Sequence, residues 1–410
     1  MKRIKKKVIS QLSIQGFKSF GPCVSIRLAA LNFVVGANAS GKSNLLSALR
    51  FIQSAIATNV EQALGEIGGK AEVWNKVQRE RREAKHLELS FSCGPLGTYV
   101  GADEKSHEVI SVNYSLKVEL PFENGRCAIV GEHLIAGIKT EGLDVSQFTF
   151  HRTRKQLKIL DPFDPQYSRE TRIDVPEQEL TRPVASGAVY SRPVLLFRDY
   201  VKSWAFFDFD AAVGREPSRE AESPRLGRKG ENLATVLHEL ETHGDGSQLR
   251  EIVDSLRGVV PGFDKLSTVA LPFEAKRGFQ IREENLKSPL NPLSASDGTI
   301  RLLLILVAAC WSAKKSQLIC IEEPENGLHP FLAQQLVGIL RRASSERQFI
   351  ITTHNPFFLD HLSPDELLMC DKHDGFTTIR HAADVEEIAG FKKHYSLGEL
   401  WTQSLLGGVP

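Results

Sequence analysis

Residues 36–43 have the residue types and the spacing that phosphate binding requires. Their sequence, Gly-Ala-Asn-Ala-Ser-Gly-Lys-Ser, fits the pattern G-x-x-x-x-G-K-[ST] of a phosphate-binding loop. Gly36 and Gly41 permit positive φ and a close approach of phosphate to the backbone. The Lys42 side chain can then reach the β- and γ-phosphates of a nucleotide, and the Ser43 hydroxyl can ligate Mg²⁺. The motif predicts a nucleotide site; its alternative is a glycine turn before a core helix.

Two adjacent carboxylates, Glu322 and Glu323, follow the apolar residues 318–321, which are expected to form a buried strand. Ligands of open α/β sheets bind at the carboxyl ends of the strands. One carboxylate there can hold Mg²⁺ directly or through water, while its neighbour orients and deprotonates an attacking water. Taken alone, the pair fits two surface glutamates equally well. Together with a phosphate-binding loop, it favours nucleotide hydrolysis.

Two further segments offer groups that could contact a phosphate. His354 follows the apolar residues 348–352, so its imidazole would emerge at the same sheet edge and could hydrogen-bond a γ-phosphate. The alternative is a structural histidine. Residues 296–299, Ser-Asp-Gly-Thr, place a hydroxyl, a glycine and N–H donors at the start of a helix, which suits an oxyanion. By themselves they fit ordinary capping by Ser296 or Asp297 better.

The elements that must position these residues are predicted by hydrophobic periodicity. Apolar residues 31–35 lead into the loop as a buried strand would, and a helix is expected from residue 44 to about residue 59. This arrangement aims backbone N–H groups and the positive end of the helix dipole at an anion. After residue 292, apolar strands alternate with helices, which is typical of a parallel sheet. The expected elements there are a helix at 300–313, a strand at 317–324, a helix at 332–343 and strands at 348–352 and 366–370.

Between these regions, the pattern is that of an antiparallel sheet followed by short helices. Alternating, β-branched segments predict strands at 8–17, 23–28, 86–92, 109–120, 126–138 and 147–160. Connections at 161–174 and 215–229 are followed by helices near 231–240 and 248–256 and by a strand pair at 266–271 and 278–282. Aromatic residues in 204–209 are expected in the core or at a partner surface, because interleaved Asp208 and Asp210 disfavour stacking on nucleic-acid bases.

Composition limits the class of protein. With 51 basic and 50 acidic residues, the overall charge indicates neither a nucleic-acid nor a membrane partner. The cysteines are scattered without a C-x-x-C pair, which argues against a zinc module or a disulfide framework and favours a reducing cytoplasm. The longest apolar run, 302–311, is too short to span a bilayer. The basic start, 2–7, is not followed by the apolar segment of a signal peptide. We therefore expect a cytoplasmic protein without a membrane partner.

The ordered set of motifs resembles the ABC-type ATPase heads of the SMC/RecF/OLD group, and in particular the stand-alone bacterial AAA family ATPases of RecF-like type. The resemblance covers about 1–55 and 285–410 well and the middle loosely. The set is specific, whereas no single motif is. The set consists of a Walker A motif and the residue after it at 36–44, a signature at 296–299, a Walker B strand at 318–324, a D-loop at 325–330 and a switch histidine at His354. The segments 14–20, 231–234 and 396–400 also fit the pattern of this group.

The resemblance implies an α/β P-loop NTPase of the ABC-ATPase head type, with a mixed or parallel core sheet, an antiparallel β-subdomain and a helical insertion. The implied parts are a first ATPase lobe at 1–160, a helical and linker insertion at 161–260 and a second lobe at 261–410. Two heads would clasp ATP and Mg²⁺ as a homodimer or a higher homo-oligomer. The implied nucleotide-binding residues are Gly36, Asn38, Ser40, Gly41, Lys42, Ser43 and Asn44, joined by Ser296 and Gly298 of the other subunit.

The resemblance also implies roles for the remaining residues. Ser43 and Glu322 would hold Mg²⁺, Glu323 would polarise the attacking water, and His354 would sense the γ-phosphate. The Walker B acid is usually Asp, whereas Glu322 is one methylene longer, and Asn355 stands where Ser is common. The glutamine loop of the family has no assigned position. Neither a C-terminal Toprim nuclease nor a further aspartate–glycine metal cluster is expected.

Four functions are consistent with such a head. The first is an ATP-gated dimerising switch, paired with a separately encoded nuclease or toxin effector in bacterial anti-phage defence, or acting on DNA. The second is a RecF/SMC-like ATPase of DNA repair or recombination that binds duplex ends through basic residues in 76–85, which otherwise form a solvated surface. A transport ATPase is disfavoured, because its signature would normally end in Gln rather than Thr299. The fourth is a nucleotide-dependent scaffold with negligible turnover.

Overall fold

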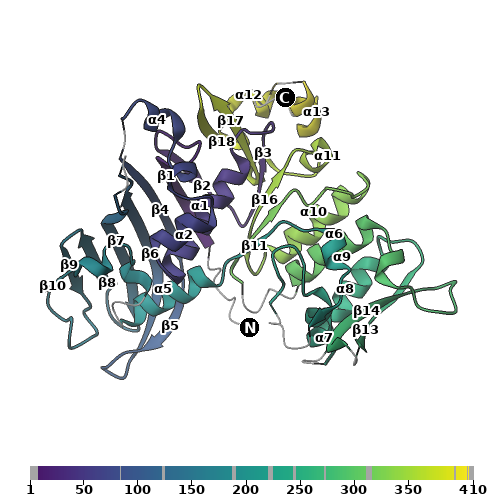
Figure 1. Cartoon of the computed structure of the whole chain (residues 1–410), viewed down its shortest axis with the longest axis horizontal. Coiled ribbons are helices and arrows are strands. Elements are labelled where there is room, and N and C mark those ends of the chain that lie inside the picture. Colours follow the sequence, from purple (N-terminus) through teal and green to yellow (C-terminus); the bar gives the residue numbers. More distant parts are fainter. Residues whose placement is uncertain are drawn as a thin grey trace.

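The computed structural model describes residues 8–83, 85–121, 125–186, 191–219, 225–242, 246–271, 274–310, 316–391, 394–403 and 405. Sheets of nine, six and three strands organise these residues. Figure 1 shows the nine-stranded sheet on the left, the six-stranded sheet in the centre and the three-stranded sheet with its helices on the right. Every helix in the described ranges is too short or too polar to cross a lipid bilayer.

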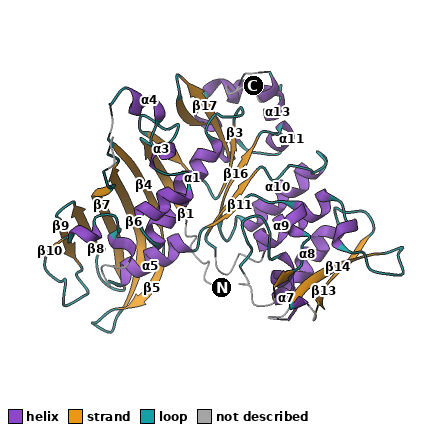
Figure 2. Cartoon of the chain, in the orientation of Figure 1, coloured by secondary structure: helices purple, strands orange, loops and turns teal. Residues whose placement is uncertain are grey.

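Alternating side chains build the nine-stranded antiparallel sheet. In β4 (His86–Gly94), every second side chain is buried, and this period of two turns one face of the sheet toward α1 (Lys42–Ala57), α2 (Val60–Glu66) and α5 (Arg192–Lys202). Figure 2 shows α1 and α5 beside this sheet. The short strand β5 (Gly97–Val100) pairs with β6. The strands in spatial order are β10 (Thr171–Asp174), β9 (Gln156–Leu160), β8 (Ser146–Thr153), β7 (Ala128–Thr140), β6 (Ser106–Glu119), β4 (His86–Gly94), β1 (Val8–Gln15) and β2 (Val24–Arg27).

The six-stranded sheet carries the predicted site. All of its pairings are parallel except that of the edge strand β18. Because parallel strands end at the same edge, the residues after β3, β15 and β16 emerge together there. The spatial order is β11 (Ala205–Phe207), β15 (Leu318–Glu322), β16 (Gln348–Thr353), β3 (Leu31–Val35), β17 (Leu367–His373) and β18 (Phe376–His381).

The central strands are buried on both faces, which explains their uninterrupted apolar sequences. Val34 and Ile350 pack into a core shared with α1 and the nine-stranded sheet. Phe33 and Ile351, one residue earlier and one later, pack into a second core shared with α9 (Asp297–Cys310) and α10 (Leu332–Ala343). Two cores on opposite faces hold the sheet rigidly, so its carboxyl edge is a fixed platform for side chains.

The three-stranded sheet packs with helices at the far side of the second core. It consists of β12 (Ser218–Arg219), β14 (Lys276–Glu283) and β13 (Phe263–Leu271), and α7 (Leu233–Thr242) and α8 (Ser247–Arg257) contact it. The remaining short helices connect larger elements. They are α3 (Lys70–Val73), α4 (Lys76–Glu80), α6 (Ala211–Gly214), α11 (Pro356–Leu359), α12 (Glu386–Phe391) and α13 (Leu397–Thr402).

Most predicted elements are confirmed, and the differences have local causes. The expected strand at 147–160 is two strands, because residues 154–155 form a bend between β8 and β9. The expected connection at 161–174 contains β10, which pairs with β9. The helix expected at 300–313 begins earlier, at Asp297, and its last predicted residues lie outside the described ranges. The aromatic side chains in 204–209 are buried, as expected.

Candidate nucleotide-binding and hydrolysis site

The phosphate-binding loop connects β3 to α1 and packs against β17 and β18. A Cβ atom on Gly36 would lie 2.3 Å from the Cys370 carbonyl oxygen, so a larger residue would displace β17. Gly41 has a φ of 117°, and a Cβ atom there would lie 2.3 Å from Thr377 Oγ1 on β18. The loop therefore keeps its conformation only with glycine at both positions.

Lys42, the first residue of α1, is held over the loop by backbone carbonyls. Its Nζ donates to the Gly36 carbonyl at 2.6 Å and to the Ala37 carbonyl at 2.9 Å. Burial lowers the pKa of Lys42, and the nearby carboxylates of Glu323 and Glu325 oppose that shift. The ammonium group thus sits within electrostatic reach of the Walker B segment, where phosphate oxygens could replace the carbonyls as its partners.

Side chains from distant segments fix the loop from behind. Asn44 Nδ2 donates to Ser19 Oγ at 2.7 Å. Thr377 Oγ1 lies 2.7 Å from Ser19 Oγ and 2.6 Å from the carbonyl oxygen of Ser40, which is buried. In this structure the predicted nucleotide-binding residues Ser40 and Asn44 therefore shape the loop through contacts with β18 and the turn after β1.

The other two predicted loop residues, Asn38 and Ser43, are exposed. Asn38 lies in the loop itself, and Ser43 lies in the first turn of α1. A cavity of about 320 Å³ adjoins this helix start and provides room for a group larger than a phosphate. It is lined by Lys18, Ser19, Asn44, Glu72, Trp74, Asn75, Lys76, Val77, Lys372 and Gly375.

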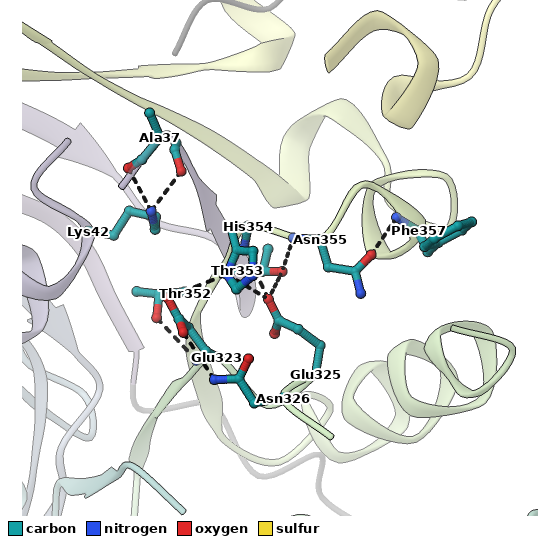
Figure 3. A network of polar contacts seen from close by, with 11 residues as sticks. Ala37, Lys42, Glu323, Glu325, Asn326, Thr352, Thr353, His354, Asn355 and Phe357 are labelled. Carbon is teal, nitrogen blue, oxygen red and sulfur yellow. Dashed lines mark hydrogen bonds and ion pairs between the residues drawn. The ribbon is translucent and has the colours of Figure 1, made fainter. Parts of the chain in front are cut away.

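Glu323 follows β15 in a strained backbone conformation. Its φ is 42°, a backbone angle that residues other than glycine rarely adopt. Such residues cluster at functional sites. Its N–H donates to the Thr352 carbonyl at 3.0 Å, and its Oε2 accepts from Asn326 Nδ2 at 3.1 Å. Its Oε1 lies 3.5 Å from His354 Nδ1. Figure 3 shows the Glu323 and His354 side chains together at the sheet edge, with Lys42 across from them.

A third carboxylate, Glu325, is buried beneath this pair. Its Oε1 accepts from Thr353 Oγ1 at 2.6 Å and from the His354 N–H at 3.0 Å, and it lies 3.6 Å from His354 Nδ1 (Figure 3). Its Oε2 is buried and has no hydrogen-bond partner among the residues that the structure describes. Burial raises the pKa of Glu325. This residue ties the segment after β15 to the segment after β16, so it positions His354 against Glu323.

Glu322, the predicted metal ligand at the end of β15, faces two arginines. Its Oε1 lies 3.4 Å from Arg50 Nη2 and 3.5 Å from Arg228 Nη2. Within the described ranges, no group of three or more His, Cys, Asp and Glu side chains is arranged to hold a metal. Mg²⁺ prefers oxygen ligands and keeps several waters when bound with phosphates, so the Glu322 carboxylate and the Ser43 hydroxyl fit it without a protein cage.

The predicted signature opens α9 and contacts the D-loop. Ser296 Oγ accepts the Thr299 N–H at 3.1 Å, so the capping expected for this sequence is present. A Cβ atom on Gly298 would lie 3.0 Å from the Gly327 carbonyl oxygen, a tight contact that would push the D-loop slightly away. Among the described residues, no hydrogen bond or ion pair joins the signature to the phosphate-binding loop of the same chain.

Arg215 fixes the approach to this helix. It is 11% exposed, and it donates to the Pro292 carbonyl at 3.1 Å and to the Ala295 carbonyl at 2.8 Å while pairing with Asp297. One side chain thus sets the path of the backbone that leads into the signature.

The structure brings Lys42, Glu323 and His354 to one sheet edge and leaves the signature at a separate helix start. Sequence reasoning gave no role to Arg215, Arg50 or Arg228 and placed Glu325 only within the D-loop. Arg50 follows Ser43 by seven residues, so it shares a helix face with that residue, which was a usable signal. Arg215, Arg228 and Glu325 offered no such sequence signal, because their contacts depend on tertiary packing.

The comparisons with known proteins agree with this geometry. Residues 31–94 and 143–360 match the protein family described as "AAA domain, putative AbiEii toxin, Type IV TA system". A comparison with proteins of curated function finds no match. Among solved structures, an SMC head bound to the C-winged helix domain of ScpA is 15% identical with a TM-score of 0.53, covering 91% of this chain and 97% of that chain.

A second similar structure is an SMC head domain with an extended coiled coil, bound to the C-terminal domain of ScpA, from Pyrococcus furiosus. It is 14% identical with a TM-score of 0.51, and the match covers 94% of this chain and all of that chain. Similarity at such low identity shows a shared fold, the α/β P-loop head of ABC type with its antiparallel and parallel sheets.

Proposed function

This chain belongs to the AAA domain family whose description names a putative AbiEii toxin of a type IV TA system, and we propose that it is an Mg²⁺-dependent ATPase that dimerises around ATP. Family and fold make it a nucleotide-binding ATPase. Beyond that, we propose the roles of individual residues, the ATP-dependent dimer and the biological purpose of the protein.

The observation that carries the proposal is the meeting of three motifs at one sheet edge. Lys42 comes from the start of α1, Glu323 follows β15, and His354 follows β16 (Figure 3). The cation would bind the β- and γ-phosphates, and the carboxylate would orient and deprotonate the attacking water. The imidazole, held by two carboxylates at Nδ1, would present its Nε2 to the γ-phosphate.

The remaining loop residues would complete the nucleotide contacts. Backbone N–H groups of the loop would surround the phosphates, and the cavity beside α1 would take the nucleoside. Ser43 and Glu322 would hold Mg²⁺, which neutralises phosphate charge when bound. The proposed binding residues are Gly36, Asn38, Ser40, Gly41, Lys42, Ser43 and Asn44.

Half of the site is proposed to come from a second copy of the chain. Ser296 is exposed and Gly298 half-buried at the α9 start, with N–H donors suited to a γ-phosphate. Three large apolar side chains that lie within three residues of the motifs in sequence are exposed: Leu293 by 75%, Phe331 by 72% and Phe357 by 51%. Such side chains around a polar site are typical of a protein interface. They support a homodimer or a higher homo-oligomer clasping ATP.

The purpose of the ATP-driven dimer is proposed to be control of a separately encoded effector, a nuclease or a toxin, in bacterial anti-phage defence. The description of the family names a toxin system, and the similar SMC heads are bound to parts of another protein, ScpA.

We also propose that the chain divides into a first ATPase lobe at 1–160, a helical and linker insertion at 161–260 and a second ATPase lobe at 261–410.

DNA repair or recombination is the second candidate function. Exposed basic residues in and after α4 would supply phosphate-backbone contacts. Two of them already pair with acids, Lys76 with Glu72 and Arg81 with Glu83, which weakens the case for DNA. A DNA affinity that falls steeply with salt concentration would favour this candidate over the effector switch.

Measurement of ATP turnover tests the catalytic assignment. We expect Glu323→Gln to lower the rate by about 10²- to 10⁴-fold, since it removes a general base while keeping the side-chain shape. Lys42→Ala should abolish nucleotide binding, and chelation of Mg²⁺ should stop turnover of the wild-type protein. If Glu323→Gln turned over ATP at the wild-type rate, the catalytic role of Glu323 would be wrong and a scaffold would be favoured.

A further inference from the structure

Two carboxylates from neighbouring strands lie side by side next to the proposed metal position. Strands β11 and β15 pair in parallel with Phe207 opposite Ile321, so the next residues, Asp208 and Glu322, leave the sheet at the same level. Asp208 is half exposed, and Glu322 is largely buried. Two negative charges at adjacent strand ends repel each other, and a cation between them offsets this repulsion.

Arg228 provides that cation in this structure. Its Nη2 lies 3.4 Å from Asp208 Oδ2 and 3.5 Å from Glu322 Oε1, so one guanidinium nitrogen is shared by both carboxylates. These separations are long for charge-assisted hydrogen bonds, which are usually 2.7–2.9 Å. The contact is therefore electrostatic and weakly directional, which makes the arginine replaceable.

The backbone around Arg228 is held by hydrogen bonds, whereas its side chain is half exposed. The Asp208 N–H donates to the Arg228 carbonyl at 3.0 Å, and the Asp210 N–H donates to the Lys229 carbonyl at 3.1 Å. The Arg228 side chain, in contrast, is 46% exposed. A long exposed side chain on a fixed backbone can leave its partners without any change in the fold.

A second arginine at the same carboxylate is held much more firmly. Arg50 Nη2 lies 3.4 Å from Glu322 Oε1, its side chain is 21% exposed, and its guanidinium lies over the Phe206 ring at 5.5 Å from the ring centre. Glu322 therefore keeps a permanent positive neighbour in Arg50. The two guanidinium groups repel each other, so Arg228 is the one that departs when a further cation arrives.

We propose that Arg228 occupies the cation position between Asp208 and Glu322 and is exchanged for Mg²⁺ when metal and nucleotide bind, leaving Asp208 as a second carboxylate that positions the metal. This inference rests on the proposed function of Glu322 as a metal ligand. Mg²⁺ carries twice the charge of a guanidinium, and it binds in phosphate sites through one or two carboxylates together with waters. The exchange keeps the pair of carboxylates neutralised both before and after the metal arrives.

The test is the affinity of the protein for Mn²⁺ in the presence of a non-hydrolysable ATP analogue, measured by electron paramagnetic resonance. We expect Asp208→Asn to raise the Mn²⁺ dissociation constant by about 10- to 100-fold, as loss of a positioning ligand does. Arg228→Met should lower that constant several-fold, because it removes a competing cation. Arg228→Lys keeps the charge and should remain close to wild type.

A matched control separates this effect from a general loss of surface charge. Arg257 is 43% exposed and also bridges two carboxylates, those of Asp254 and Asp264, but it lies on α8. Arg257→Met should leave the Mn²⁺ dissociation constant unchanged. Circular dichroism and thermal unfolding of each variant confirm that it is folded.

The outcomes distinguish this inference from the proposed function. If Glu322→Gln weakens Mn²⁺ binding but Asp208→Asn and Arg228→Met match wild type, Arg228 is only a surface ion pair and the exchange is wrong. If Glu322→Gln also binds Mn²⁺ as the wild-type protein does, the metal assignment of Glu322 itself fails. An Arg228→Met variant with weaker Mn²⁺ binding contradicts the exchange as well.

Discussion

At the scale of single residues, the arrangement around His354 depends on a buried carboxylate. Glu325 takes the His354 N–H and the Thr353 hydroxyl on one oxygen, and that oxygen also lies near the imidazole. Glu323 lies 3.5 Å from the same ring nitrogen, so two acidic side chains flank Nδ1. The environment of Glu325 therefore bears on the position of His354.

Glu325 predicts a pH dependence of stability. Burial raises the pKa of its carboxyl, so folding favours the protonated form. The stability that Glu325 contributes is therefore complete below its ordinary pKa and is lost as the pH rises through the raised value. Glu325→Gln keeps an acceptor oxygen for Thr353 and His354 but cannot ionise. We expect the unfolding free energy of this variant, relative to wild type, to increase as the pH rises above the ordinary glutamate pKa of about 4.3.

Chemical denaturation at several pH values measures this difference. A difference that stays constant across the range would mean that Glu325 ionises as easily in the folded protein as in the unfolded chain, contrary to its burial. A relative stability that decreases with pH would reverse the sign and rule out desolvation as the main cause.

At the residue scale, the sequence predicted the groups that obey a fixed local spacing and missed those that do not. Lys42 and Glu323 follow from a loop motif and a strand end, since short-range geometry alone places them. Arg228 reaches Glu322 across 94 positions of sequence, and Asp208 joins it only because β11 pairs with β15. Pairings of this kind depend on which strands become neighbours, and local patterns carry no information about that.

At the scale of elements, the start of α9 is shaped by contacts that come from outside the helix. Arg215 holds two carbonyls in the segment before it and pairs with Asp297 in its first turn. The D-loop lies close to the helix start, where a Cβ atom on Gly298 would lie 3.0 Å from the Gly327 carbonyl oxygen. The proposed γ-phosphate receptor is therefore a preformed helix start and does not need nucleotide to take shape.

Replacement of Arg215 tests this positioning. Arg215→Met removes the side-chain donor to the Ala295 carbonyl and one of the two donors to the Pro292 carbonyl, which keeps the Ala295 N–H. We therefore expect the unfolding free energy to fall by roughly 1–3 kcal/mol. Nucleotide binding by one subunit should persist, because the phosphate-binding loop is elsewhere, while ATP-dependent association should weaken. Arg282→Met, an exposed arginine on β14, is the control and should change neither property.

Denaturation, nucleotide binding and association state can be measured on the same preparations. Loss of nucleotide binding in Arg215→Met would show that the signature and the loop depend on each other within one chain. Association at the wild-type ATP dependence would show that the path into α9 has no part in the interface.

Most elements were predictable because their periodicity is strong. The helix at 332–343 and the strand at 31–35 have the predicted bounds, since one amphipathic face or full burial marks each of them. The division of 147–160 into two strands was not predictable from alternation, because residues on both sides of a bend keep the same period. β10 was missed because its polar sequence, Thr-Arg-Ile-Asp, lies at a sheet edge and buries no side chain fully.

At the scale of the whole molecule, two hydrophobic cores pack on opposite faces of the six-stranded sheet (Figure 1). The proposed catalytic residues lie at the carboxyl ends of its parallel strands. The phosphate-binding loop lies between β3 and α1, which packs in the first core, whereas the signature opens α9, which packs in the second core. With no direct polar contact between the two motifs in the described part of the chain, a triphosphate would be enclosed only by two copies. The γ-phosphate would then link the two subunits, and hydrolysis would release them.

The most direct test of this account is the molar mass of the protein in solution, measured by light scattering with and without saturating ATP and Mg²⁺. We predict that Glu323→Gln is a monomer without nucleotide and a stable dimer or higher oligomer with ATP, because it binds ATP but hydrolyses it very slowly. Ser296→Arg in the same background should bind ATP and remain a monomer. A Glu323→Gln protein that binds ATP at saturation and still has the molar mass of a monomer would contradict ATP-driven dimerisation.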